Sequence, residues 1–293
     1  MMKGGGRGGA GVPRCDLCEE PSVYLDRVRG CHLCGEHFLR DVEGRVRRTI
    51  WDFRLIRPGE RVAVALSGGK DSTVLIHLLR RILLGAGDVS LTAITVDEGI
   101  AGYRDATLQV ARETVARLGV GHRVVSFGDL AGSTLDAMVS AGEDHPCSLC
   151  GIHRRNALEA AAAEIGATAI ATGHNLNDQA QTVLMNCLRG DLPGFTRPPV
   201  SDGTAHGIRR IKPLFRIPEK EVALYGMVAG IYRELPECPY AATALRSEVR
   251  RMVDRLEHLR PGTLGRIVRG QEEVAALFAR AAGKTGNEPD PDP

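Results

Sequence analysis

The sequence predicts an α/β fold in which helices cover both faces of a parallel sheet, with a small cysteine-rich module before it and further helices after it. Three observations support this prediction. From about residue 59, short apolar stretches alternate with longer helical ones. A glycine-containing turn joins the first of these strands to its helix, and two closely spaced cysteine pairs precede the whole region. Short strands that alternate with helices pair in parallel and are buried on both faces.

The chain of 293 residues is long enough for one α/β core of about 200 residues and a small accessory module. The two ends contain too little apolar sequence to fold, so we expect them to be disordered. The predicted segments are a disordered start at 1–13, a zinc knuckle with a linker helix at 14–58, the α/β domain at 59–240, C-terminal helices at 241–282 and a disordered tail at 283–293.

The individual elements follow from the apolar pattern, taken in chain order. An amphipathic, arginine-rich stretch at 38–56 is predicted to be helical, and the break at Arg57, Pro58 and Gly59 ends it. The predicted strands are short apolar runs at 62–66, 91–96, 122–127 and 168–172. The helices that follow them are predicted from Asp71, near 103–118, at 151–165 and from about 177, and three more are predicted at 218–230, 243–259 and 263–281.

Charge is spread unevenly along a chain whose formal net charge is only +2. Residues 27–61 hold nine arginines and five acidic residues, and residues 243–269 hold seven arginines and three acidic residues. Arginine forks onto phosphate groups, so these stretches predict two basic surfaces, although solvated helix faces would look the same. No apolar run approaches the roughly 18 residues that cross a bilayer, and no signal-peptide pattern is present, so we expect a cytoplasmic enzyme without membrane contact.

The turn after the first strand, Ser67-Gly68-Gly69-Lys70-Asp71-Ser72, predicts a phosphate site. Glycines let the backbone approach an anion, and the free N–H groups at the start of the helix then point at it. The spacing differs from a Walker A loop. This turn resembles the PP-loop of the ATP pyrophosphatases, enzymes that cleave ATP between its α and β phosphates. The resemblance implies that Lys70 balances phosphate charge and that Asp71 helps to hold Mg²⁺.

A second strand-to-helix turn presents Gly173, Asn175 and Asp178 at the same carboxyl edge of the sheet. Asp178 could also be no more than an acidic group at a helix start, and His174 no more than a packed histidine. The motifs GHN, Asp178, Gln181-Thr182 and LRGD resemble the thiouridine-forming branch of the PP-loop family, the TtcA/TtuA-type tRNA thiolases. The expected ATP-binding residues are Ala65, Ser67, Gly68, Gly69, Lys70, Asp71, Ser72, Val96, Arg154, Gly173 and Asn175.

The N-terminal cysteines, Cys15-x-x-Cys18 and Cys31-x-x-Cys34, have the spacing of a closed tetrahedral zinc site. His32 or His37 could replace one ligand, and a rubredoxin-type iron centre is an alternative. Four protein ligands leave the ion no open position, so this site is expected to stabilise a small fold. Related thiolases begin with a similar knuckle, which implies that it helps to grip tRNA.

A third pair, Cys147-x-x-Cys150, lacks the other half of a zinc site, and its remaining partners are Cys187 and Cys238. Cys187 lies in an apolar helical run where a buried, unreactive cysteine is expected. Cys238 lies in a proline-flanked loop. The resemblance implies that Cys147, Cys150 and Cys238 bind a [4Fe-4S] cluster with one iron open to hold hydrosulfide. A redox pair that relays persulfide, and a zinc site completed by Cys187, are the alternatives.

The resemblance therefore implies a tRNA thiolase: ATP adenylates the C2 oxygen of a uridine, and sulfur displaces AMP. Asp178, Arg154 and the three cysteines Cys147, Cys150 and Cys238 are the expected catalytic residues, with Arg154 facing the nucleotide and stabilising charge. It also implies a sulfur donor, either a thiocarboxylated ubiquitin-like carrier or sulfide, and a homodimer. No cysteine follows Cys238, whereas relatives often have a second knuckle there, so the modified uridine, wobble or T-loop, is not settled by the motifs.

Two other functions are compatible with parts of the same pattern. A PP-loop ligase of the lysidine-synthetase type would use a nitrogen nucleophile and would need no cysteine triad. A non-catalytic zinc-containing RNA-binding protein would bind tRNA without cleaving ATP.

Overall fold

A computed structural model describes residues 12–85, 88–142, 145–197, 207–240 and 245–285. The segments expected to be disordered therefore lie mostly outside the described residues. Residues 12 and 13 are described, and the last helix continues through Thr285, past the predicted end of the helical segment at 282.

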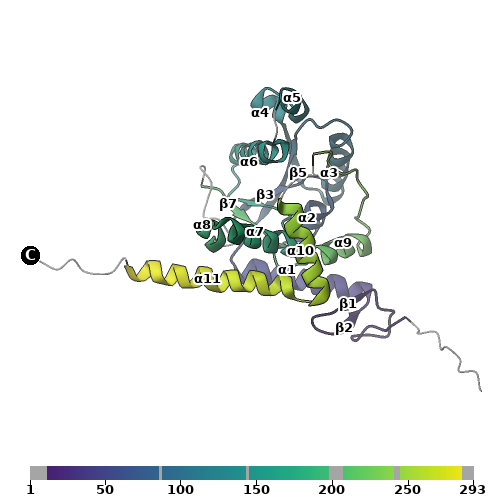
Figure 1. The fold of residues 1–293 in the computed structure, drawn as a ribbon. Coiled ribbons are helices and arrows are strands. Elements are labelled where there is room, and N and C mark those ends of the chain that lie inside the picture. The colour runs from purple at the N-terminus through teal and green to yellow at the C-terminus, as the bar shows by residue number, and fades with distance from the viewer. Residues whose placement is uncertain (1–11, 86–87, 143–144, 198–206, 241–244, 286–293) are drawn as a thin grey trace, which may run out of the picture.

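The centre of the fold is one parallel sheet of five strands in the order β5-β4-β3-β6-β7 (Figure 1). The strands are β3 (Arg61–Ala65), β4 (Ser90–Asp97), β5 (Gly121–Ser126), β6 (Ala169–Ala171) and β7 (Arg209–Ile211). The first four correspond to the predicted strands. The fifth, β7, was not predicted, because its sequence Arg-Arg-Ile is short and mostly charged. The predicted parallel α/β fold is confirmed.

Alternate side chains of the strands enter two separate cores, as expected for a sheet covered on both faces. Val62 and Val64 pack in the larger core, whereas Ala63 packs in the other. The helices contributing to the larger core are α1 (Gly35–Asp52), α2 (Lys70–Ile82), α3 (Arg104–Leu118) and α9 (Glu219–Val228). On the opposite side lie α4 (Phe127–Ala131), α5 (Leu135–Ser140) and α6 (Pro146–Glu164) (Figure 1).

The cysteine-rich module is a two-stranded antiparallel hairpin of β1 (Tyr24–Asp26) and β2 (Cys31–Leu33), followed directly by α1. This helix buries Phe38 and Val42 in the same core as the sheet. The Tyr24 hydroxyl also donates to Glu221 Oε1 of α9 at 2.6 Å, and Arg45 of α1 pairs with the same carboxylate. The module is thus fixed to the α/β domain through a shared core and a buried polar cluster.

A third apolar cluster joins α7 (Leu176–Arg189) to the C-terminal helices α10 (Leu245–Leu259) and α11 (Thr263–Thr285). A short helix, α8 (Leu192–Thr196), follows α7. Because α7 starts at the carboxyl edge of the sheet, this packing carries the N-terminal part of α10 toward that edge. Within the described residues, no helix has both the length and the apolar composition needed to cross a membrane.

Candidate active site and metal centres

The PP-loop connects β3 to α2 and is closed by its own side chains. Ser72 Oγ accepts a hydrogen bond from the Ser67 N–H at 3.2 Å and donates to the Gly69 carbonyl at 3.0 Å. Gly68 has φ +86°, and a Cβ there would lie 2.0 Å from the Thr107 carbonyl oxygen. Glycine is therefore required at position 68. Gly69 caps α2, which begins at Lys70, one residue before the predicted start.

Lys70 is held between two carboxylates. Its Nζ lies 3.0 Å from Asp71 Oδ2 and 2.8 Å from Glu219 Oε1. Burial lowers the pKa of Lys70, but the two carboxylates outweigh burial, so the net pKa is raised and the ammonium group stays charged. Glu219 also pairs with Arg250 of α10 at 2.8 Å. Glu219 was not predicted from sequence, because it lies 149 residues from Lys70.

The turn after β6, which contains Gly173, packs directly against the backbone of the PP-loop. A Cβ on Gly173 would lie 3.0 Å from the Asp71 carbonyl carbon and from the Ser72 nitrogen. Asn175 Nδ2 donates to Asp71 Oδ1 at 3.3 Å. Asn175 and Asp178 also form a capping box at the start of α7. The capping role considered for Asp178 is therefore present, at the same sheet edge as Asp71.

The carboxylates at this edge are partly desolvated. Burial raises the pKa of both Asp71 and Asp178, and each feels repulsion from the nearby Glu219. Arg246 of α10 approaches Asp178 Oδ1 at 4.0 Å. Two acidic groups in a partly buried site, with lysine and arginine nearby, suit a Mg²⁺–nucleotide complex.

Two further groups at this edge add positive charge and a neutral ring. Lys212 follows β7, and its Nζ donates to Gln179 Oε1 at 3.1 Å. Burial lowers the pKa of Lys212, and Asp178 opposes that effect. Burial also lowers the pKa of His174 to about 4, so this imidazole is neutral at pH 7. Lys212 was missed because its strand was missed. His174 is an exposed residue whose Nδ1 lies 2.8 Å from Thr172 Oγ1, so the packed histidine considered from the sequence is not what the structure shows.

The three cysteines expected to share a cluster come from the start of α6 and from the loop before residue 241. Pro146 begins α6, so Cys147 and Cys150 lie inside the helix, which was predicted to start only at 151. Cys147 Sγ donates to the Tyr240 carbonyl oxygen at 2.7 Å. Cys150 is buried, and Cys238 packs against the same apolar cluster. The structure thus brings the CxxC pair and the Cys238 loop together.

The spacing of these three thiols differs from that of ligands to a single ion. Among the described residues, their sulfurs are not all within 4.8 Å of one another. Ligands of a four-iron cluster bind different irons and need not converge on one point, so Cys147, Cys150 and Cys238 stay the predicted cluster ligands. Cys187 belongs to neither site and is exposed in the last turn of α7, which corrects the prediction that it is buried.

A chain of ion pairs connects the cysteine site to the PP-loop. Arg154 Nη2 donates to Cys150 Sγ at 3.2 Å, and Arg154 Nε lies 2.7 Å from Glu98 Oε1. The other oxygen of Glu98 lies 2.8 Å from Arg104 Nε, and Arg104 Nη1 donates to the Ser67 carbonyl at 3.2 Å. Glu98 and Arg104 are each 3% exposed. Arg154, expected to face the nucleotide, is held between Cys150 and Glu98, and neither Glu98 nor Arg104 was predicted.

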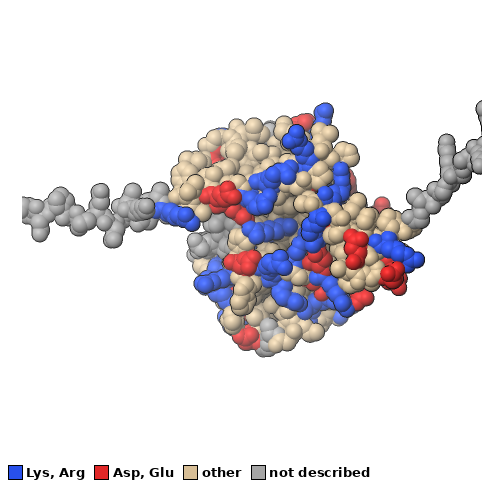
Figure 2. Space-filling model, turned by 90° about the horizontal axis from the view of Figure 1, so that it is seen from below, with Lys and Arg blue, Asp and Glu red and all other residues tan. Residues whose placement is uncertain are grey.

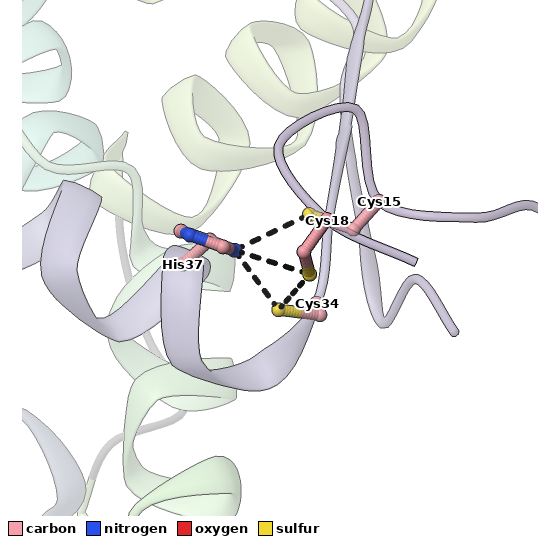
Figure 3. Close-up of side chains that lie close together, drawn as sticks. All are labelled: Cys15, Cys18, Cys34 and His37. Atoms are coloured by element: carbon pink, nitrogen blue, oxygen red, sulfur yellow. Dashed lines mark hydrogen bonds between the residues drawn. The ribbon is translucent and has the colours of Figure 1, made fainter. Parts of the chain in front are cut away.

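The N-terminal metal site contains a histidine. The ligand atoms of Cys15, Cys18, Cys34 and His37 lie within 4.8 Å of one another (Figure 3). His37 Nδ1 is 3.3 to 3.5 Å from the three sulfurs, and Cys18 Sγ is 3.7 Å from Cys34 Sγ. A zinc tetrahedron with bonds of about 2.3 Å has edges of about 3.8 Å, so this group has the dimensions of a zinc site.

Cys31 does not belong to this group, which corrects the four-cysteine assignment. Side chains alternate along a strand, so Cys31 shares a face of β2 with Leu33. Leu33 is buried in the main core, and Cys31 packs against that core. His37, on the first turn of α1, takes the fourth position. The spacing Cys34-x-x-His37 was the sequence signal for it.

Comparison with known proteins identifies the family of this fold. A family model described as a PP-loop domain matches residues 40–253. The tRNA 2-thiolation protein NcsA of Haloferax volcanii is 37% identical over 282 residues, covering 91% of this chain and 88% of that protein. The cytoplasmic tRNA 2-thiolation protein 1 of Bos taurus is 41% identical over 273 residues, covering 90% of this chain and 78% of that protein.

A solved structure extends the comparison to three dimensions. The U34-tRNA thiolase NcsA from Methanococcus maripaludis, determined with its [4Fe-4S] cluster, superposes with a TM-score of 0.80 at 36% identity. The match covers 90% of this chain and 87% of that chain. The predicted fold and family are confirmed: the chain belongs to the PP-loop family, in its branch of tRNA 2-thiolation proteins.

Proposed function

We propose that this protein is an ATP-dependent tRNA sulfurtransferase that converts a uridine to 2-thiouridine. The observation that carries the proposal is the connection from Cys150 through Arg154, Glu98 and Arg104 to the PP-loop. Sulfur transfer to an activated base needs the sulfur site and the nucleotide site to be held at a fixed separation. A ligase with a nitrogen nucleophile would have no use for three convergent thiols.

ATP is bound by the PP-loop and by the second turn at the sheet edge. The N–H groups of Gly69 and the start of α2 bind the phosphates of ATP. When ATP binds, Lys70 leaves its ion pair with Glu219 and pairs with a phosphate instead. Asp71 and Asp178 hold the Mg²⁺ that accompanies ATP. Gly173 lets the nucleotide pass close to the backbone. The remaining proposed contacts are those of Ala65, Ser67, Gly68, Ser72, Val96 and Asn175.

The reaction has two steps at one carbon. The C2 oxygen of uridine attacks the α phosphate, pyrophosphate leaves, and the base becomes an adenylate whose oxygen is now part of a good leaving group. Sulfur then adds at C2, and AMP departs with the oxygen. Arg154, a permanently charged group beside Cys150, stabilises negative charge that develops during the displacement.

Cys147, Cys150 and Cys238 would hold the [4Fe-4S] cluster. Bound through three protein thiolates, a four-iron cluster supplies one Lewis-acidic iron that has no protein ligand. The Tyr240 hydroxyl donates to Asp136 Oδ1 at 2.7 Å, which anchors the loop that carries Cys238. This anchoring fixes the third thiol relative to the start of α6.

Zn²⁺ bound by Cys15, Cys18, Cys34 and His37 stabilises the knuckle. We further propose that the modified base is the wobble uridine, the position for which the thiolase from Methanococcus maripaludis is named. The proposed sulfur donor is a thiocarboxylated ubiquitin-like carrier or sulfide. The proposed active form is a homodimer in the cytoplasm.

An anaerobic assay tests the proposal. Purified protein is reconstituted with iron and sulfide, mixed with ATP, Mg²⁺, tRNA and sulfide, and followed by pyrophosphate release and nucleoside mass spectrometry. We expect 2-thiouridine from the wild type and from Cys187→Ala, and none from Cys238→Ala. Pyrophosphate release with a nitrogen-containing product, or tRNA binding without ATP cleavage, would contradict the proposal, and so would an active Cys238→Ala protein.

A further inference from the structure

A groove of about 650 Å³ lies between the knuckle, α1, the start of α9 and the beginning of α11. Several cations line it, and four of the exposed ones come from four different elements and form no ion pair among the described residues. They are Arg27 of the knuckle, Arg48 of α1, Lys220 of α9 and Arg269 of α11. None of the four has a carboxylate partner among the residues that the structure describes. Uncompensated positive charge from four elements therefore converges on one hollow.

The other charges around the groove are largely used within the protein. Arg29 pairs with Asp26 and Asp41, and Arg216 pairs with Glu272 at 2.7 Å. Glu257 accepts hydrogen bonds from the backbone N–H groups of Gly262 and Leu264 at the turn between α10 and α11. These contacts stiffen the walls, so the groove is preformed and its four free cations face solvent.

The groove continues toward the reaction site. A second hollow of about 530 Å³ is lined by Lys70 and Glu219, and it shares Arg27 and Lys220 with the first. A ligand that follows the two hollows would therefore run from the knuckle to the PP-loop lysine. Figure 2 shows Lys and Arg side chains gathered on the face that carries α1, α11 and the knuckle, seen from below relative to Figure 1.

We propose that this groove binds the sugar-phosphate backbone of the tRNA substrate. Three of the four free cations are arginines, which fork onto phosphate oxygens and keep their charge. Free cations from four elements around one hollow match a strand in which every nucleotide carries a negative phosphate. The two basic stretches of sequence, 27–61 and 243–269, both contribute to it, through Arg27 and Arg48 and through Arg269.

This inference rests on the proposed function, because it names how the tRNA of that reaction is held. Contacts to phosphates do not read sequence, so the groove orients tRNA without selecting a base. Removing one phosphate contact should weaken binding at 0.15 M salt by about fourfold, and should flatten the dependence of log Kd on log salt concentration by about 0.7 to 0.9. Removing four independent contacts should weaken binding by about 250-fold.

The test measures tRNA binding to the full-length, anaerobically reconstituted protein by fluorescence anisotropy at several salt concentrations. The variants are Arg27→Gln, Arg48→Gln, Lys220→Gln and Arg269→Gln, singly and combined. Arg47→Gln is the matched control, because Arg47 is the exposed neighbour of Arg48 on α1 but lines neither hollow. We expect the losses given above for the groove variants, less than a twofold change for Arg47→Gln, and unchanged ATP binding throughout.

The outcomes separate this inference from the proposed function. If the wild type binds and thiolates tRNA, and the folded single and combined variants bind tRNA like the wild type, the groove proposal is wrong and the enzyme assignment stands. If the wild type itself neither binds tRNA nor forms 2-thiouridine, the proposed function fails. If the variants keep tRNA binding and sulfide-driven thiolation but lose only carrier-driven thiolation, the groove binds an acidic protein and the RNA proposal is overturned. Thermal melting followed by circular dichroism establishes that each variant is folded. If the combined variant is unstable, tRNA binding by the single variants tests the groove proposal.

Discussion

The N-terminal and the central cysteine sites start from the same CxxC motif and reach opposite geometries. In the knuckle, three sulfurs and the His37 imidazole lie within 4.8 Å of one another. In the central site, Cys147, Cys150 and Cys238 meet without that compactness. Four ligands enclose one ion completely and serve the fold, whereas the three proposed cluster ligands would leave one iron without a protein ligand.

The two sites also differ in how their side chains are held, by local contacts in the knuckle and by long-range contacts in the central site. The knuckle sulfurs and the His37 imidazole come from one local segment, the knuckle and the first turn of α1. The central sulfurs depend on long-range contacts, since Cys147 bonds to Tyr240 and Cys150 bonds to an arginine paired with buried Glu98. The environment of a CxxC pair therefore decides its role, and its spacing alone does not.

The largest expected effect separates the two metals. Cys150→Ala removes a buried thiol that we propose as a cluster ligand, so we expect loss of bound iron, no detectable 2-thiouridine and an unchanged zinc content. Metal analysis and nucleoside mass spectrometry on the same sample measure all three. Cys15→Ala is the reciprocal variant, expected to lose zinc and keep iron. If Cys150→Ala kept its iron, Cys150 would not be a ligand of the iron cluster, and the assignment of the two cysteine sites to two different metals would fail.

The next largest effect is expected at Glu98, which joins Arg154 to Arg104. Glu98→Gln keeps the shape of the side chain but removes the charge that holds Arg154 and Arg104. Residues that orient ligands typically change affinity or activity by about 10- to 100-fold, and we expect a loss of thiolation in that range.

Glu98→Gln should also alter the electron paramagnetic resonance spectrum of the reduced cluster, a signature that a general loss of stability would not produce. Glu164→Gln is the control, because Glu164 forms an exposed pair with Arg123 at 3.0 Å. A Glu98→Gln protein with wild-type activity and an unchanged spectrum would show that Glu98 does not position the site.

A smaller effect is expected at the knuckle. His37→Ala removes one of four ligands, so zinc should be lost and tRNA binding should weaken, while iron content and ATP binding persist. Inductively coupled plasma analysis and tRNA binding measure these changes. His32→Ala is the control, because His32 lies outside the ligand group. Zinc retention in His37→Ala would contradict the assignment of this ligand.

The sequence predicted those parts of the molecule whose structure depends on interactions between residues close together in the chain. The β3 strand, the glycines of the PP-loop and the start of α7 each follow from a pattern within a few residues, and each appears in the structure. The predicted groups at the sheet edge meet because parallel strands bring their carboxyl ends together.

The remaining features depend on contacts between distant segments. Glu219 reaches Lys70 only after α9 packs, and Glu98 and Arg104 are recognised only once their burial is known. The β7 strand has too few apolar residues to be predicted from the sequence. The choice between Cys31 and His37 turned on which face of a three-residue strand points to the core, and a CxxC count could not show this.

The smallest expected effect tests that choice directly. Because Cys31 packs against the main core and lies outside the ligand group, Cys31→Ala should keep one zinc per chain and lower the free energy of unfolding by no more than about 1 kcal/mol. Zinc stoichiometry and urea unfolding provide the measurements, with Cys34→Ala as the matched variant that should lose the ion. If Cys31→Ala lost its zinc while His37→Ala kept it, the four cysteines would be the ligands after all, and the knuckle would have to pack differently against α1.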